Sequence, residues 1–295
     1  MPLRSSLLAV LTLLPSLLGA CTPRRPWQQA GWRPERPAQR IVLGSVLAAE
    51  SLLGVLPPER IAAVHFVAAT PSFSLVAGLA EGLPTVGASP SQLLSAHPDL
   101  VIVDAYTQAE TLALLASADV PVMRTADPHS FDDIAANLRE LGQVTGLEKE
   151  TEALVAAMQG RLAELREAGR GLAEWRLLGL DGALHTYGTG SLFDALVKAV
   201  GARNLAAEHD AGAFRKLDVE AVLAWRPDVI VIAGDADAGP GAPPWLQQTP
   251  GLSLLPCVQR GRVIVLPLAE LSTTSHRLVE AVSAVQRQLL AWGKP

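Results

Sequence analysis

Residues 93–103 read LLSAHPDLVIV, and residues 222–232 read VLAWRPDVIVI. Each segment begins with a helical pattern that a proline ends, and each continues through a Pro-Asp pair into an apolar run that suits a buried strand. The repeated unit predicts two related lobes. Eleven similar residues can also arise by chance, because helix–proline–strand junctions are common in α/β proteins, so the order of the surrounding elements has to agree.

That order does agree, since short apolar runs alternate with longer amphipathic ones in both halves of the chain. Such alternation is typical of a parallel sheet with helices on both faces. The fold class we expect is therefore α/β, with two Rossmann-like lobes. The expected strands are 40–43, 61–65, 100–103, 120–124, 177–180, 229–232 and 263–266, and the expected helices are 47–55, 91–96, 108–118, 131–145, 192–200, 219–225 and 276–292.

A single long helix is expected between the lobes. Apolar or small residues follow at spacings of three and four, namely Leu147, Thr151, Leu154, Met158, Leu162 and Leu165. This spacing predicts an amphipathic helix over about 148–168, with Gly169 and Gly171 ending it. The chain then divides into an N-terminal lobe (40–146), a linker helix (147–170) and a C-terminal lobe (171–295). A rigid linker of this kind predicts little hinge motion.

Composition excludes several classes of protein. The chain has 295 residues, of which 49% are hydrophobic and 18% charged, with a net charge of -5 and no Lys/Arg-rich run. A nucleic-acid partner is therefore not expected. Two cysteines are too few for a disulfide scaffold or a cysteine-rich zinc module. Beyond the N-terminus, no apolar run approaches the roughly 18 residues of a membrane span.

The N-terminus reads MPLRSSLLAVLTLLPSLLGAC over residues 1–21, which has the layout of a secretory signal peptide (1–20). Its last four residues, 18–21, resemble a bacterial lipobox, in which Cys21 is lipidated; an ordinary signal that happens to precede a cysteine is the alternative. The Pro- and Arg-containing segment 21–39 suits a tether. We expect an exported lipoprotein that is anchored on the periplasmic or cell-surface side of a membrane.

From Arg40 onward the chain resembles the bacterial ABC-transporter substrate-binding proteins for ferric siderophores, haem and cobalamin. The likeness is carried by RIVLGSVLAAESLLGVLPPERIAAV (40–64), by both Pro-Asp strand entries, by SFDDIAANLRELGQVTG (130–146), by YGTGSLFDALVKAVGARNLA (187–206) and by PGLSLLPCVQRGRVIVLP (250–267). The resemblance implies a class III solute-binding protein. Such a protein captures an iron chelate (siderophore or haem) or cobalamin between its lobes and delivers it to the permease and ATPase subunits of an importer.

The same resemblance implies an acidic residue on each lobe that meets arginines of the permease, seven residues before the Pro-Asp proline. In the C-terminal lobe this residue is Glu220, which could also be an ordinary acid in the first turn of a helix. In the N-terminal lobe the position holds Ser91, so the pattern is broken there. The resemblance therefore implies a docking carboxylate on the C-terminal lobe alone.

Candidate ligand-binding residues follow the strands, because ligands of open parallel sheets lie beyond the carboxyl ends of the strands. We expect aromatic contacts and added polar contacts from imidazoles; packing is the alternative role for each aromatic residue. The aromatic candidates are Tyr106, Tyr187, Trp245, Phe66 and Phe73, and the polar ones are His65 and His185.

Two other functions stay open at this stage. His65, His129 and His185, with Asp235 or Glu270, could hold a bare divalent metal ion, although no short-range ligand spacing supports this. An exported α/β hydrolase is less favoured, because no G-x-S-x-G string is present and Gly188–Ser191 lacks both a third fingerprint glycine and a Walker lysine. We expect no enzyme activity, no cofactor and no resident metal.

Overall fold

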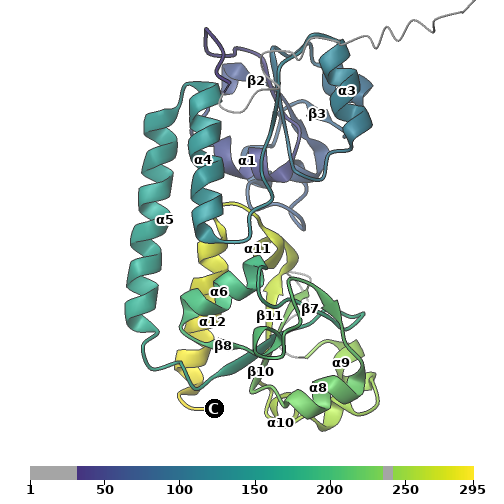
Figure 1. The fold of residues 1–295 in the computed structure, drawn as a ribbon, viewed down its shortest axis with the longest axis vertical. Coiled ribbons are helices and arrows are strands. Elements are labelled where there is room, and N and C mark those ends of the chain that lie inside the picture. The colour runs from purple at the N-terminus through teal and green to yellow at the C-terminus, as the bar shows by residue number, and fades with distance from the viewer. Residues whose placement is uncertain (1–31, 235–241) are drawn as a thin grey trace, which may run out of the picture.

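The computed structural model describes residues 32–234 and 242–295. They form two α/β lobes, one above the other in Figure 1, with the helices α4 (Phe131–Thr145) and α5 (Glu148–Ala168) along one side. The predicted fold class is confirmed. The expected signal peptide and Cys21 lie outside the described residues, as do Asp235 and most of the expected tether.

The N-terminal lobe contains a five-stranded parallel sheet with the order β3-β2-β1-β4-β5. Successive residues of a strand are buried on opposite faces of this sheet. In β1, Ile41 and Leu43 pack with α1 and α4, whereas Val42 packs with α2 and α3. Both faces are therefore covered by helices. The elements are β1 (Ile41–Leu43), α1 (Val46–Leu52), η2 (Pro58–Arg60), β2 (Ile61–His65), η3 (Phe66–Ala69), η4 (Ala77–Leu79), β3 (Thr85–Val86), α2 (Pro90–Ser95), β4 (Leu100–Val103), α3 (Ala109–Ser117) and β5 (Val122–Arg124).

The C-terminal lobe contains a four-stranded parallel sheet with the order β11-β10-β6-β8, and a separate antiparallel pair of β7 and β9. Helices α5, α6 and α12 cover one face of the larger sheet, and the shorter helices α7 to α10 cover the other. The elements are β6 (Arg176–Gly179), β7 (His185–Thr186), α6 (Leu192–Val200), β8 (Arg203–Asn204), α7 (Leu205–Glu208), β9 (Arg215–Lys216), α8 (Val219–Trp225), β10 (Val229–Gly234), α9 (Pro244–Gln248), η5 (Leu252–Leu254), α10 (Pro256–Gln259), β11 (Val263–Pro267), α11 (Leu268–Ser272) and α12 (Leu278–Trp292).

The sequence repeat is also a structural repeat. The residue before each Pro-Asp pair, His97 or Arg226, has a positive φ, of 49° and 51°. In the first lobe, the Asp99 carboxylate accepts the amide N–H of Arg40 just before β1, at 2.8 Å. In the second lobe, Asp228 accepts the amide N–H of Arg176 at the start of β6, at 3.1 Å. Each aspartate thus joins the strand it precedes to the start of a neighbouring strand.

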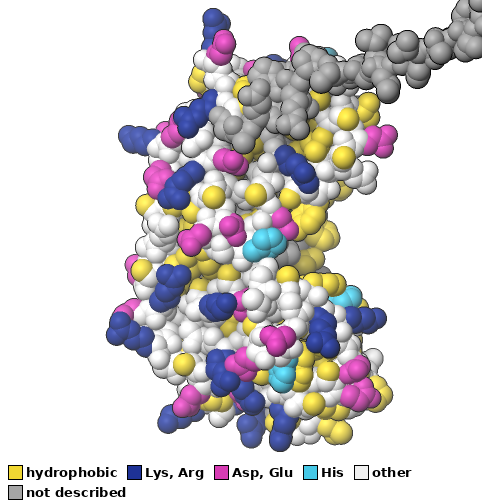
Figure 2. Space-filling view, viewed as in Figure 1, with side chains coloured by type: hydrophobic (Ala, Val, Ile, Leu, Met, Phe, Trp, Pro, Cys, Tyr) yellow, Lys and Arg dark blue, Asp and Glu magenta, His cyan; other side chains and the backbone are white. Residues whose placement is uncertain are grey.

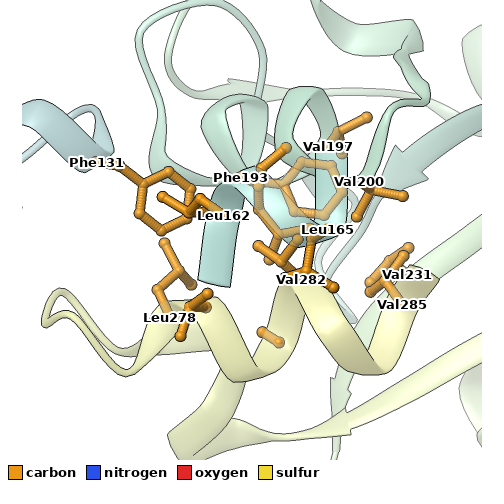
Figure 3. Packing of buried hydrophobic residues seen from close by; sticks show 14 of the residues in the cluster. Phe131, Leu162, Leu165, Phe193, Val197, Val200, Val231, Leu278, Val282 and Val285 are labelled. Atoms are coloured by element: carbon orange, nitrogen blue, oxygen red, sulfur yellow. The ribbon is translucent and has the colours of Figure 1, made fainter. Parts of the chain in front are cut away.

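Helix α4 belongs to both hydrophobic cores. Its first half, including Phe131 and Leu138, packs with the linker helix α5 and with α6 and α12 of the C-terminal lobe. Its second half, including Leu141 and Val144, packs with α1 of the N-terminal lobe. Figure 3 shows Phe131 of α4, Leu162 of α5 and Leu278 of α12 together at the left of the cluster. The lobes are therefore joined by packed side chains as well as by the chain itself.

Most expected elements are confirmed, including the linker helix at Glu148–Ala168, the helix Phe131–Thr145 and the strand Leu100–Val103. The last helix begins at Leu278 and not at His276. The short elements β3, β7, β8, β9, α7, α9, α10 and α11 were not predicted. Each has two to five residues, too few to show a hydrophobic period.

We predict that two glycines of the helical pair respond oppositely to alanine. A Cβ on Gly142 of α4 would lie 2.1 Å from Thr151 Oγ1 and 3.1 Å from Glu148 Cα, whereas a Cβ on Gly160 of α5 would meet nothing within 4 Å. Gly142→Ala should therefore lower the free energy of unfolding by about 1–3 kcal/mol. Gly160→Ala should raise it by up to about 1 kcal/mol, because alanine favours the helix.

Chemical denaturation of both variants beside the unchanged protein measures these differences. Equal effects of the two substitutions would contradict a close contact between α4 and α5 at Gly142.

Candidate functional site

A cleft lies between the lobes and consists of two adjoining pockets. The pocket on the N-terminal lobe has a volume of about 740 Å³, and the pocket on the C-terminal lobe has about 450 Å³. Both volumes fall in the range of small-molecule sites. The two pockets share Tyr106, Asp127, Pro128 and Thr274, so they form one continuous site. Figure 2 shows a hollow between the lobes at the right-hand edge of the molecule.

Strand ends build the N-terminal pocket, as expected for a parallel sheet. Its lining includes Gly44 and Ser45 after β1, His65 at the end of β2, Asp104 after β4, and Asp127 beyond β5. Burial lowers the pKa of His65 and outweighs the opposing charge of Asp104. The imidazole is therefore neutral near pH 7. Its Nδ1 accepts the backbone N–H of Val67 at 3.4 Å, so Nε2 carries the proton and is left as a donor.

Tyr106 stands where the two pockets meet. Tyr106 is 72% exposed, and its hydroxyl donates a hydrogen bond of 2.8 Å to Asp127 Oδ2. Partial burial of the phenol, together with this hydrogen bond and the negative charges of Asp127 and Asp104, raises the pKa of Tyr106 to about 12. Tyr106 is therefore a neutral phenol whose face is free for contact and whose hydroxyl is already engaged.

An aromatic group lines the C-terminal pocket. Tyr187 lies 5.7 Å from Phe214 and 6.3 Å from Phe193 between ring centroids. Phe214 is 60% exposed, which is unusual for so large an apolar side chain. Together these rings present an apolar wall on the side of the cleft opposite Tyr106.

His185 supports this wall from behind. Its ring stacks on Phe214 at 4.7 Å, and its Nδ1 lies 2.9 Å from Asp181 Oδ2. Burial alone would raise the pKa of Asp181, but hydrogen bonds from the His185 amide and ring and from the Ala183 amide lower it. Asp181 is thus a charged carboxylate that lines the pocket, whereas His185 is not among the lining residues.

The structure brings only some of the expected ligand-binding residues together. Tyr106, Tyr187 and His65 line the cleft. Phe66, Phe73, His185 and Trp245 are absent from the lining of both pockets. Phe66 and Phe73 are exposed at the surface, and Trp245 on α9 packs against the core of the C-terminal lobe, which is the packing alternative considered for it.

The three histidines considered for a metal ion do not form one site. His65 lines the N-terminal pocket, His129 lines the C-terminal pocket, and His185 is bonded to Asp181 behind Phe214. Within residues 32–234 and 242–295, no group of three or more His, Cys, Asp or Glu side chains could hold a metal ion. The three-histidine alternative is therefore wrong for the described part of the chain.

Several lining residues were missed by sequence reasoning. Phe214 precedes a strand of only two residues, and Thr273 and Thr274 lie in the turn between α11 and α12. No periodic pattern marks such positions. Asp127 could have been found, because it directly precedes the Pro128-His129 pair that follows a predicted strand.

The charge of the cleft is one-sided. Carboxylates of Asp104, Glu110, Asp127 and Asp181 line it. No Lys or Arg side chain lines either pocket among the described residues. Arg124 is not among the lining residues, but its guanidinium donates to the carbonyl oxygen of Ala105, which is one of them.

The two positions considered for docking are equivalent in the two lobes. Ser91 lies in the first turn of α2, which precedes β4, and Glu220 lies in the first turn of α8, which precedes β10. Both residues are exposed. The absence of a carboxylate at Ser91 therefore leaves the two lobes with different surfaces at matching places.

None of the helices in the described part of the chain combines the length and the apolar character needed to cross a membrane. Cys21, the candidate lipidation site, lies outside the described residues.

Comparison with known proteins places the chain among solute-binding proteins. The model of the periplasmic binding protein family matches residues 80–269. An uncharacterized ABC transporter substrate-binding lipoprotein of Bacillus subtilis, YvrC, is 22% identical over 207 residues, which cover 67% of this chain and 64% of the relative. The match thus spans somewhat less than two thirds of that relative's length.

Two solved structures show the same fold. The periplasmic heme-binding protein RhuT of Roseiflexus sp. RS-1 is 28% identical, with a TM-score of 0.73, over 85% of this chain and 97% of that one. The periplasmic vitamin B12 binding protein BtuF of Vibrio cholerae is 22% identical, with a TM-score of 0.69, over 88% and 99%. Both are solute-binding proteins rather than enzymes.

We predict that Asp127 contributes, together with burial, to the raised pKa of Tyr106. In a Tyr187→Phe background only Tyr106 can ionise as a tyrosine, because the chain has two tyrosines. Its pKa should be about 12 and should fall toward 10 in Asp127→Asn, since the substitution removes the negative charge that opposes the phenolate. Tyrosinate absorbance after rapid pH jumps measures both values. An unchanged pKa in Asp127→Asn would show that the hydrogen bond does not form in solution.

Proposed function

This chain belongs to the periplasmic binding protein family, and we propose that it is the extracytoplasmic substrate-binding lipoprotein of an ABC importer for a bulky chelate. It captures the chelate between its lobes and delivers it to the permease and ATPase subunits. Cys21 carries the lipid anchor in this proposal, after removal of residues 1–20. The B. subtilis relative, which is named a substrate-binding lipoprotein of an ABC transporter, supports this assignment.

The observation that carries the proposal is the aromatic character of both walls of the cleft. Tyr106 faces the site from the N-terminal lobe, and Tyr187 and Phe214 face it from the C-terminal lobe. Aromatic faces bind flat or bulky apolar ligands over a large area and lose little conformational entropy on binding. A cargo held between such walls contacts both lobes at once.

The charge of the lining narrows the class of cargo. Four carboxylates and no cationic side chain line the described cleft, so an anion would be repelled and its charges would find no partner. Haem is suggested by the RhuT likeness, but its two propionates would find four carboxylates and no Lys or Arg among the described lining residues. We therefore propose a cargo without net negative charge, such as a cationic hydroxamate-type ferric chelate or a corrinoid.

We predict that the purified protein binds an uncharged or cationic chelate with sub-micromolar affinity. The panel is a cationic ferric trihydroxamate, cyanocobalamin, haemin, an anionic ferric tricatecholate and zinc, and binding is measured by calorimetry and tryptophan quenching. Tyr106→Ala should weaken binding about tenfold, the value of one stacked aromatic contact. Phe73→Ala is the matched control, because Phe73 is also an exposed aromatic residue but lies outside the lining.

Tight binding of haemin or the tricatecholate alone would refute the proposed charge class and leave the transport role standing. A protein that responds to zinc alone, or to no compound in the panel, would contradict the proposed chelate cargo.

Docking on the permease is proposed to depend on Glu220. Its carboxylate lies on the exposed first turn of α8, while the equivalent turn of α2 carries the neutral Ser91. A permease that matches these surfaces would offer a cation opposite the C-terminal lobe and a neutral contact opposite the N-terminal lobe.

We predict that Glu220→Arg reduces uptake of the cargo at least about tenfold in cells, while the affinity of the purified protein for cargo changes less than about twofold. The reason is that the substitution reverses a charge at the docking surface and leaves the cleft lining unchanged. Glu280→Arg, which reverses an exposed charge on α12, is the control. Undiminished uptake by Glu220→Arg would remove Glu220 from the interface.

A further inference from the structure

A buried carboxylate of the N-terminal lobe, that of Glu50, accepts hydrogen bonds from the C-terminal lobe beneath the cleft. We call these hydrogen bonds between the lobes the Glu50 crossing. Glu50 lies in α1 of the N-terminal lobe and is 1% exposed. Its Oε2 accepts hydrogen bonds from the hydroxyls of Thr273 and Ser275, the latter at 2.8 Å, and both hydroxyls belong to the C-terminal lobe. More than 220 residues separate these partners along the chain, so the contact is purely tertiary.

The other contacts of Glu50 fix it within its own lobe and strengthen the crossing. Its Oε1 accepts the amide N–H of Leu75 at 3.0 Å. Its backbone carbonyl accepts Arg277 Nε at 3.4 Å, which is a second link to the C-terminal lobe. The hydroxyls of Thr273 and Ser275 lie 2.9 Å apart, so both converge on one carboxylate oxygen.

This crossing positions the floor of the cleft. Thr274 stands between the two residues that bind Glu50, and it lines both pockets. Thr273 also lines the C-terminal pocket, while Ser45, the N-cap of α1, and Leu47 within α1 line the N-terminal pocket. The same carboxylate therefore ties α1 to the turn that joins the two halves of the binding site.

Breaking the Glu50 crossing costs free energy, because it leaves a buried carboxylate without two of its donors. A buried carboxylate is tolerated only while donors satisfy it. The Glu50 carboxylate accepts three hydrogen bonds, from the hydroxyls of Thr273 and Ser275 and from the backbone amide of Leu75. A shift of one lobe against the other would remove two of these three donors at once. The arrangement thus favours one relative placement of the lobes over its neighbours.

We propose that Glu50 is a positioning residue for cargo binding: its hydrogen bonds to the Thr273–Ser275 turn hold that turn of one lobe against helix α1 of the other and so set the width of the cleft. We call this hydrogen-bonded contact the lock. Its effect on affinity rests on the proposed binding function, but the lock itself does not require a cargo. Glu50 touches no ligand in this role, because it is absent from the lining of both pockets.

The test compares Glu50→Ala with Glu50→Gln. Alanine removes every side-chain bond, whereas the glutamine oxygen can accept the Leu75 amide and its NH₂ group can donate to the two hydroxyls. Glu140→Ala, which removes an exposed glutamate on α4, is the matched control. Thr273→Val/Ser275→Ala removes the lock from the other side and leaves α1 untouched.

The distance between the lobes is read by pulsed electron paramagnetic resonance. Spin labels are placed at Glu81→Cys and Arg260→Cys, which are exposed positions on opposite lobes, while the native Cys257 is buried. We expect a broader distance distribution in Glu50→Ala and in Thr273→Val/Ser275→Ala, and an unchanged one in Glu50→Gln and Glu140→Ala. Circular dichroism confirms that each variant is folded before it is compared.

Affinity for the chelate that binds best is the second measurement. We expect Kd to rise about tenfold or more in Glu50→Ala and less than threefold in Glu50→Gln. Unbroadened distances in both folded lock variants would overturn the proposal, and Thr273→Val/Ser275→Ala decides alone if Glu50→Ala does not fold. Because the distance measurement uses no cargo, a wrong cargo assignment would leave its outcome unchanged.

Discussion

Helices α4 and α5 share one apolar seam, which α4 continues into the core of the N-terminal lobe, and the rest of the structure depends on it. The buried side chains of α4 pass from the core of the C-terminal lobe at Phe131 to that of the N-terminal lobe at Val144. Because close-packed cores resist deformation, a helix shared by two of them cannot tilt without disturbing both. The contact at Gly142 and the left-handed Gly146 at the end of α4 make the tight return into α5.

The seam lies on one side of the molecule, and the Glu50 crossing lies beneath the cleft. The first is apolar and extended, and the second is polar and confined to a single carboxylate. Two connections at different places restrict rotation as well as separation of the lobes. In the proposed function, a cleft held in this way is largely formed before the cargo arrives, so less binding energy is spent on ordering it.

Within this frame the two walls of the cleft differ in construction. Tyr106 stands nearly alone on the N-terminal side and is tied by its hydroxyl to Asp127. On the other side Phe214 is one of several rings, stacked on His185 and adjacent to Tyr187. Carboxylates lie at both walls. The site therefore combines apolar faces with negative charge, which favours a bulky cargo that is not an anion.

The sequence by itself determined the two-lobed α/β fold, the linker helix and three lining residues: His65, Tyr106 and Tyr187. Hydrophobic period and Pro-Asp junctions encode long elements locally, and the ends of those strands fall at one edge of the sheet. Only the tertiary structure decided that Phe214 and Thr274 line the cleft, that Trp245 packs elsewhere, and that Glu50 meets Thr273 and Ser275. Such contacts join residues that are far apart in the chain. Several of these residues lie on turns or beside two-residue strands, which are too short for a hydrophobic period to predict them.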